Sequence, residues 1–310
     1  MIRVENLAKR FGDVRAVDGV SFEVRDGEIY GLLGPNGAGK TTTFSMLSGL
    51  LRPDSGRVTY GGLDLAAEPD RVKRLLGVVP QEVAVYEELT ARENLRFWGG
   101  LYGLSGAALD RAVDRSLEDV GLTGRSREPV KRFSGGMKRR LNMAVALVHD
   151  PRVIIFDEPT VGVDPQARVN ILDVVRRTAA EGAAVLYTTH YLEEAERLCD
   201  RIGILDHGRL LAEGTLDELK ARVADEEVVT LQGRFDTSAA RAELEKLPGV
   251  RVVSADEGRL TLSAESAAGT GAASLLGEIY GRGLAIDRVS IEPPSLNGLF
   301  LKLTGRELRD

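Results

Sequence analysis

The segment Gly34-Pro35-Asn36-Gly37-Ala38-Gly39-Lys40-Thr41 constrains this chain more than any other stretch of its sequence. It matches the pattern G-x-x-x-x-G-K-[ST] at every fixed position. An apolar run over 28–33 predicts a strand before it, and the residues from about 40 to 50 predict a helix after it. The glycines let successive backbone N–H groups face a phosphate, and the helix N-terminus adds partial positive charge. The segment therefore predicts a phosphate-binding loop in an α/β sheet.

The residue types of this loop favour a nucleoside triphosphate with Mg²⁺ as the ligand. Lys40 is expected to reach the β- and γ-phosphates, and the Thr41 hydroxyl is expected to bind Mg²⁺. A glycine-rich turn without a ligand gives no reason for a Lys-Thr pair at this spacing. We therefore expect the loop and the following Thr42 to contact ATP.

Two adjacent carboxylates follow a second apolar run. Residues 153–156 (Val-Ile-Ile-Phe) predict a buried strand, and Asp157 and Glu158 come directly after it. At that edge of the sheet they would lie near the phosphate loop. Asp157 is the predicted Mg²⁺-organising acid, and Glu158 is the predicted general base for the attacking water.

A second anion site is predicted at Ser134-Gly135-Gly136. Ser134 suits the N-cap of the helix that follows, and the two glycines leave backbone N–H groups accessible. An ordinary capped helix explains these residues when they are taken alone. Beside the phosphate loop, a second phosphate contact is the better interpretation.

The run Phe133-Ser134-Gly135-Gly136-Met137 resembles the ABC signature sequence, which usually reads Leu-Ser-Gly-Gly-Gln. On this basis the chain resembles the ABC ATPases over about residues 1–215. The resemblance implies an α/β P-loop ABC ATPase domain with a mixed sheet core and a helical subdomain. It also implies a homodimer, with each ATP clamped between the loop of one chain and the signature of the other. Met137 departs from the usual glutamine, whereas the serine and glycines expected to contact ATP are present.

Four further positions follow the family order, and their roles are implied by the resemblance. Gln81 matches the glutamine that binds Mg²⁺ and senses the membrane partner, so it is counted with the catalytic residues. His190 matches the switch histidine at the γ-phosphate. Asp164 ends the loop that crosses the dimer interface and joins the ATP contacts. Phe11 stands where an aromatic ring stacks on adenine.

Lys138, Arg139 and Arg140 follow the signature at the start of a predicted helix. Cations are disfavoured there by the helix dipole. Two interpretations remain open: a solvated basic face, or attraction to phosphate or to an acidic patch on a partner.

Composition limits the cell compartment and the partners. A net charge of -6 and a pI of about 5.4 argue against a nucleic-acid binder. One cysteine, Cys199, fits a reducing compartment. No run approaches the roughly 18 apolar residues of a membrane span. We expect a cytoplasmic protein, peripheral on the inner face of the membrane through a permease partner.

A second domain is predicted after residue 218, giving an ATP-binding domain at 1–218 and an accessory domain at 219–310. Its predicted order is β-α-β-β-α-β, that of a small α+β, ferredoxin-like unit. The predicted strands are 228–231, 251–254, 259–263 and 285–291, and the predicted helices are 238–247, 273–282 and 295–303.

The accessory domain is predicted to serve dimerisation or regulation and to hold no catalytic group. Its last helix carries Leu296, Leu299, Phe300 and Leu303 on one face. This stripe either packs on its own small sheet or meets another surface, and the two are equally favoured.

The segments at 89–104 and 294–308 resemble ATPases that serve ABC-2 exporters of the daunorubicin-resistance type. The resemblance implies an ATP-hydrolysing subunit that drives a separate membrane permease, exporting a drug, lipid or ion. The alternative is a nucleotide-gated soluble ABC scaffold that is not coupled to transport.

Overall fold

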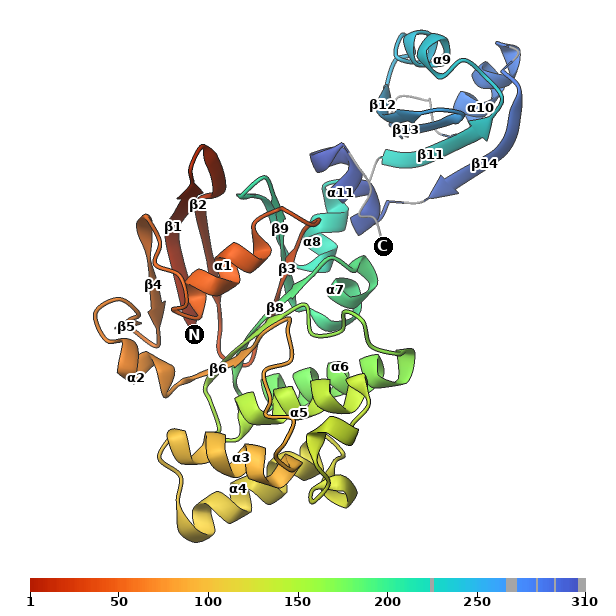
Figure 1. Cartoon of the computed structure of the whole chain (residues 1–310). Coiled ribbons are helices and arrows are strands. Elements are labelled where there is room, and N and C mark those ends of the chain that lie inside the picture. The colour runs from red at the N-terminus through yellow and green to blue at the C-terminus, as the bar shows by residue number, and fades with distance from the viewer. Residues whose placement is uncertain (224–225, 266–271, 283, 293, 306–310) are drawn as a thin grey trace. The chain divides into compact units, whose positions relative to one another are not determined.

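The computed structural model describes residues 1–223, 226–265, 272–282, 284–292 and 294–305 (Figure 1). The chain forms two compact units, residues 1–210 and 211–310. The division predicted at 218/219 lies close to this point and stays a prediction as a functional boundary. No helix within the described ranges has the length and apolar character needed to cross a membrane.

The first unit is organised around a six-stranded sheet with the order β10-β9-β3-β8-β7-β6, whose edge strand β10 continues past residue 210. Strands β9, β3, β8, β7 and β6 pair in parallel. Every residue of β3, β7 and β8 is buried, as expected for central parallel strands covered on both faces. The strands span Ile29–Leu33 (β3), Leu76–Val79 (β6), Val153–Asp157 (β7), Ala184–Thr189 (β8), Arg201–Asp206 (β9) and Arg209–Gly214 (β10).

A second, antiparallel sheet contains most of the N-terminal segment. Its order is β2-β1-β4-β5, and β1 lies between β2 and β4. The strands span Ile2–Phe11 (β1), Val14–Val24 (β2), Ser55–Tyr60 (β4) and Leu63–Asp64 (β5). Together with the parallel sheet it gives the predicted P-loop ABC ATPase fold with a mixed β core.

Three helices form a separate helical subdomain within the first unit. They are α3 (Ala91–Leu101), α4 (Gly106–Asp119) and α5 (Gly135–Leu147), and each packs against the other two. Figure 1 shows α3 and α4 together at one end of the unit, with α5 beside α6. The other helical segments are α1 (Lys40–Leu47), α2 (Pro69–Lys73), α6 (Pro165–Ala180), α7 (Leu192–Leu198) and two 3₁₀ turns (Thr123–Arg125, Val130–Arg132).

The second unit has the predicted β-α-β-β-α-β order. Its antiparallel sheet runs β12-β13-β11-β14, so the first and third strands of the unit lie at the centre. This is the ferredoxin-like arrangement and confirms the fold prediction. The elements span Leu216–Ala221 (α8), Glu226–Gly233 (β11), Thr237–Leu244 (α9), Val250–Asp256 (β12), Arg259–Glu265 (β13), Ala272–Gly281 (α10), Ile286–Glu292 (β14) and Leu296–Thr304 (α11).

Each unit has its own apolar core. Two clusters fill the first unit, and a third lies between the second unit's sheet and its helices around Val229, Leu262 and Ile279. The stripe on α11 is buried at Leu296, Leu299 and Phe300, and α11 packs on α8 and β11. Leu303, the fourth residue of the stripe, is 36% exposed.

Candidate phosphate and water-activating site

The phosphate loop connects the carboxyl end of β3 to α1, as predicted. Gly37 and Gly39 have φ of 82° and 106°, conformations that side chains disfavour. A Cβ on Gly39 would lie 2.4 Å from the carbonyl oxygen of Ala16. Only glycine therefore fits this turn, and the loop can present its backbone N–H groups to a phosphate.

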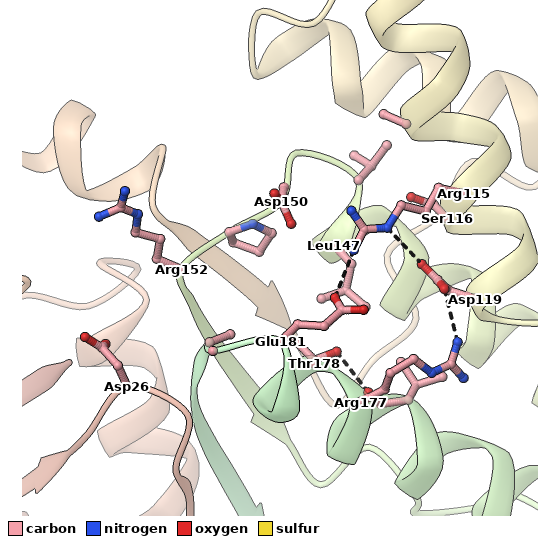
Figure 2. Close-up of a pocket in the computed structure, with 16 residues that line it drawn as sticks. Asp26, Arg115, Ser116, Asp119, Leu147, Asp150, Arg152, Arg177, Thr178 and Glu181 are labelled. Atoms are coloured by element: carbon pink, nitrogen blue, oxygen red, sulfur yellow. Dashed lines mark hydrogen bonds and ion pairs between the residues drawn. The ribbon is translucent and has the colours of Figure 1, made fainter.

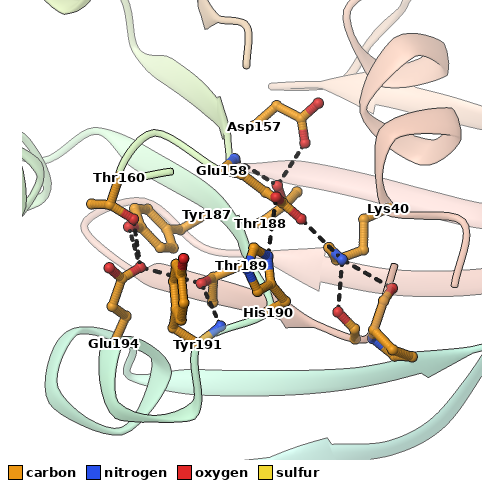
Figure 3. A network of polar contacts seen from close by, with 12 residues as sticks. Lys40, Asp157, Glu158, Thr160, Tyr187, Thr188, Thr189, His190, Tyr191 and Glu194 are labelled. Atoms are coloured by element: carbon orange, nitrogen blue, oxygen red, sulfur yellow. Dashed lines mark hydrogen bonds and ion pairs between the residues drawn. The ribbon is translucent and has the colours of Figure 1, made fainter. Parts of the chain in front are cut away.

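Lys40 lies at the centre of the site and is 4% exposed. Its Nζ donates to the carbonyl oxygens of Gly34 at 2.6 Å and Pro35 at 3.1 Å. It also lies 3.0 Å from Oε1 of Glu158 (Figure 3). One buried ammonium thus bridges the phosphate loop and the end of β7, where it can face bound phosphates.

Asp157 and Thr41 are in contact at the mouth of the loop. The Thr188 hydroxyl donates to Oδ1 of Asp157 at 2.7 Å. Burial and the neighbouring Glu158 carboxylate raise the pKa of Asp157, while the hydrogen bonds from Thr188 and Thr41 oppose the shift. A buried carboxylate beside a hydroxyl is an oxygen donor set that suits Mg²⁺.

Glu158 has a left-handed backbone conformation, with φ of 45°. Its Oε2 lies 3.1 Å from Nδ1 of His190 (Figure 3). Burial alone would raise the pKa of this carboxyl, but the His190 ring and the Lys40 charge outweigh burial and hold the pKa below its usual range. The carboxylate is therefore ionised and can accept a proton, and strained backbone of this kind is concentrated at functional sites.

A buried carboxylate that the sequence reasoning missed supports the same loops. Glu194 is 3% exposed, and its Oε2 accepts hydrogen bonds from the hydroxyls of Thr160, Tyr187 and Thr189 at 3.0, 2.8 and 3.2 Å (Figure 3). These donors belong to the loop after β7 and to β8, so Glu194 joins the loop after Glu158 to the strand that precedes His190. Its position four residues after His190 was the only sequence signal.

The Ser134 segment begins α5, as predicted. The Ser134 hydroxyl accepts a hydrogen bond from the Met137 N–H at 3.3 Å. Gly135 is open, with nothing within 4 Å of the space that a Cβ would fill. At Gly136, a Cβ would lie 3.4 Å from Oδ2 of Asp164, so the predicted dimer-crossing loop is a neighbour of the signature within the same chain.

Phe11 and Gln81 lie at the surface. Phe11 ends β1 with 51% exposure, and Nζ of Lys9 lies 5.8 Å from its ring centroid. Such an exposed ring is open to stacking. Gln81 follows β6 with an exposed side chain, while its carbonyl is held inside by Arg139. Within the monomer, the structure thus brings together Lys40, Thr41, Asp157, Glu158 and His190.

The basic run after the signature is not a solvated face. Arg139 is 3% exposed and bonds four backbone carbonyls. Lys138 pairs with Glu87 at 2.5 Å, and Arg140 donates to the carbonyl of Val120 at 2.9 Å. Both earlier interpretations of this run fail for Arg139, because its partners are carbonyls of its own chain.

A pocket of about 450 Å³ lies at the opposite edge of the parallel sheet (Figure 2). Ion pairs cross it between α4 and α6: Arg115 with Glu181 at 2.9 Å, and Arg177 with Asp119 at 3.1 Å. The segments 150–152 and 181–183 line it at the amino ends of β7 and β8. Ligands of open α/β sheets bind at the carboxyl ends, so this pocket is not the nucleotide site.

Comparison with known proteins finds a matching family model in each of the two units. The ABC transporter family model matches residues 17–161, and the model for the C-terminal domain of DrrA1-3-like ATP-binding proteins matches 214–304. The linearmycin resistance ATP-binding protein LnrL of Bacillus subtilis (strain 168) is 44% identical over 311 residues and is covered completely, as is this chain. The daunorubicin resistance ATP-binding protein DrrA3 of Streptomyces coeruleorubidus is 40% identical over 99% of this chain and 97% of its own length.

Solved structures agree with this assignment of the fold. The ATP-binding subunit of an ABC transporter superimposes with a TM-score of 0.66 at 36% identity, covering 72% of this chain and 92% of that chain. A nucleotide-free ATP-binding cassette from an ABC transporter gives 0.63 at 28% identity, covering 71% and 94%.

Proposed function

The chain belongs to the ABC transporter family of ATP-binding proteins, and from this premise we propose that its ATP-driven dimerisation works a separate membrane permease. The family binds ATP with Mg²⁺, hydrolyses it and dimerises. In the cycle that we propose, two chains close on two ATP molecules and reopen after hydrolysis. The difference in ATP affinity between the closed and open states sets the work available to the permease.

The proposed site is shared between two copies. The loop amides and Lys40 of one copy hold the phosphates, and the N-terminus of α5 in the other copy, at Ser134 and Gly135, meets the γ-phosphate. Thr41, Asp157 and Gln81 would hold Mg²⁺, which screens the phosphate charge. Glu158 takes the proton of the attacking water. His190 lies beside it, with its Nδ1 3.1 Å from Oε2 of Glu158.

An exposed apolar patch carries the proposal of a permease partner. Val83, Tyr86, Phe97 and Leu101 are 41%, 48%, 42% and 64% exposed. The rings of Tyr86 and Phe97 pack edge to face with centroids 5.1 Å apart. Gathered apolar side chains of this kind mark protein or membrane interaction sites. The patch follows Gln81 directly, so a partner there would act on the segment that leads into the site.

Phe97→Asp is expected to weaken copurification with the permease at least about tenfold, because a charge would be buried in the docking surface. The ATPase rate of the isolated chain should not change. Leu50→Asp is the matched control, because Leu50 is 76% exposed in the turn after α1, outside the patch. Equal copurification of both variants would refute the docking patch and favour the soluble scaffold.

The names of the relatives bear on the cargo and on the place of action. LnrL and DrrA3 are named for antibiotic resistance, and a Nod factor export protein of Ralstonia nicotianae is 40% identical over the whole chain. These names favour a drug over a lipid or an ion and favour export over import. We propose that the chain acts at the cytoplasmic face of the membrane, held there by the permease.

The accessory unit is proposed to serve dimerisation or regulation. Within the described ranges it shows no group of side chains able to hold a metal ion, and its core is separate from those of the first unit. A chain ending at Val223 is therefore expected to keep its ATP affinity within about twofold, since all the proposed ATP contacts lie before that point. Its self-association, or the stability of its complex with the permease, should fall.

Nucleotide titration and sedimentation of the truncated chain test this expectation. Loss of ATP affinity in a folded truncation would show that the second unit completes the site. Unchanged dimerisation and unchanged transport would leave that unit as a packing appendage.

A further inference from the structure

Arg139 makes an unusual set of contacts for a buried arginine. It lies on the second turn of α5, directly after the signature, and is 3% exposed. Nε donates to the carbonyl of Pro159 at 2.7 Å, and Nη2 donates to the carbonyl of Glu158 at 3.0 Å. Nη1 donates to the carbonyls of Pro80 and Gln81. Four backbone oxygens, and no carboxylate of the described residues, hold this guanidinium.

These four oxygens belong to two separate parts of the site. Glu158 and its neighbour Pro159 follow β7 and carry the proposed general base. Pro80 and Gln81 follow β6 and lead into the exposed apolar patch. A single side chain of the helical subdomain thus fixes the backbone at both places, although they are far apart in the sequence.

Other side chains of α5 hold the same segment. Lys138 pairs with Glu87 at 2.5 Å. The side-chain oxygen of Asn142 accepts a hydrogen bond from the Ala84 N–H at 3.0 Å. The segment 80–87 is therefore attached to α5 at three points, and Arg139 is the point that also reaches Glu158.

We propose that Arg139 is a positioning residue that couples the segment 80–87 to the general base. A shift of this segment moves the Arg139 guanidinium and with it the carbonyl of Glu158, and movement of the Glu158 loop is passed back to the segment. The proposal rests on the assigned role of Glu158 but does not require the permease.

Lysine cannot replace arginine in this role. The guanidinium is a planar fork with five N–H donors, so one side chain can bond carbonyls in two directions at once. An ammonium keeps the charge but presents three donors from a single atom. Arg139→Lys therefore leaves the buried charge in place and removes the bridge.

The test compares Arg139→Lys with Arg140→Lys in the full-length chain. Arg140 is the matched control because it bonds a single carbonyl, that of Val120, at 2.9 Å. For Arg139→Lys we expect kcat for ATP to fall about tenfold through misplacement of Glu158. KM for ATP should stay within about twofold, because the phosphate loop is untouched. Arg140→Lys should retain both constants.

The fluorescence of Trp98 reports on the segment 80–87, which Arg139 contacts at Pro80 and Gln81. Trp98 is the only tryptophan of the chain, and its ring lies 6.3 Å from that of Tyr86. Its emission should change when a non-hydrolysable ATP analogue binds to the wild type. In Arg139→Lys this change should fall by more than half, although the analogue binds equally well.

Several results would overturn the proposal. These are an unchanged kcat and Trp98 response in Arg139→Lys, equal losses in both variants, a raised KM alone, or no Trp98 response in the wild type. If Arg139→Lys does not fold, Lys138→Gln removes the attachment at Glu87 from a more exposed position. It should reduce the Trp98 response, and no reduction would count against coupling. Failure of the permease proposal leaves all these readouts intact, because they use the isolated chain.

Discussion

Glu158→Gln is expected to lower the rate of ATP hydrolysis about 10³-fold, which is the range for loss of a general base. An amide cannot accept the proton of the attacking water. The amide can still occupy the space between Lys40 and His190, which lie 3.0 and 3.1 Å from the carboxylate oxygens. ATP should therefore still bind. Removing one negative charge beside the phosphates should also favour the closed dimer.

The measurements are steady-state ATPase activity and size-exclusion chromatography with and without ATP and Mg²⁺. The variant should elute as a dimer only when ATP is present. Glu193→Gln, an exposed acid on α7 next to the buried Glu194, is the control and should behave as the wild type. Turnover by Glu158→Gln near the wild-type rate would show that another group activates the water.

Ser134→Arg is expected to reduce hydrolysis roughly 100-fold or more, the scale of losing a preorganised anion contact. Ser134 is exposed at the N-terminus of α5, and the adjacent Gly135 leaves this helix end open. A long side chain there would fill the space that the ATP of the other copy must enter. Nucleotide binding to the phosphate loop of each monomer should persist.

Fluorescent-nucleotide binding to the monomer, together with the dependence of the ATPase rate on protein concentration, checks this expectation. Ser105→Arg is the matched control, because Ser105 is also an exposed N-cap serine, on α4. Cooperative hydrolysis retained by Ser134→Arg would rule out a site composed of two chains.

The central strands could be predicted because each is encoded by a short, continuous run of apolar residues. Residues 153–156 and 184–187 are continuous apolar runs, each followed by a polar residue, and the structure extends them only to Asp157 and Thr189. The observed ends of two helices differ from the predicted ends, because residues at the helix termini determine where each helix starts or stops. The helix α1 ends at Leu47 because Gly49 has φ of 75°. The helix α6 begins at Pro165, earlier than the predicted residue 168, because Asp164 caps it.

The resemblance implied a mixed sheet core, but the strands of the antiparallel N-terminal sheet and their pairing were not predicted. Between β1 and β2, the pairing register shifts at several places, including between Val4 and Leu7. Such bulges interrupt the alternation of apolar and polar side chains by which a half-buried strand is recognised. The pairing of β1 with both β2 and β4 is a long-range choice that no local pattern specifies.

The phosphate loop could be predicted because all its residues are contiguous. Arg139 and Glu194 could not, because a charged side chain has the same sequence pattern whether it is solvated or buried. Whether it is buried depends on where the helical subdomain and the loop after β7 meet, and on whether partners there satisfy the charge. Arg139 donates hydrogen bonds to four carbonyl oxygens, and Glu194 accepts hydrogen bonds from three hydroxyls.

The separate cores of the two units have an evolutionary consequence. Within the described residues, the apolar clusters of the first unit contain no side chain from the second, and the reverse also holds. A lineage can therefore gain, lose or exchange the ferredoxin-like unit without repacking the ATP-binding unit. Sequence changes in one of these cores can therefore accumulate without a matching change in the other core.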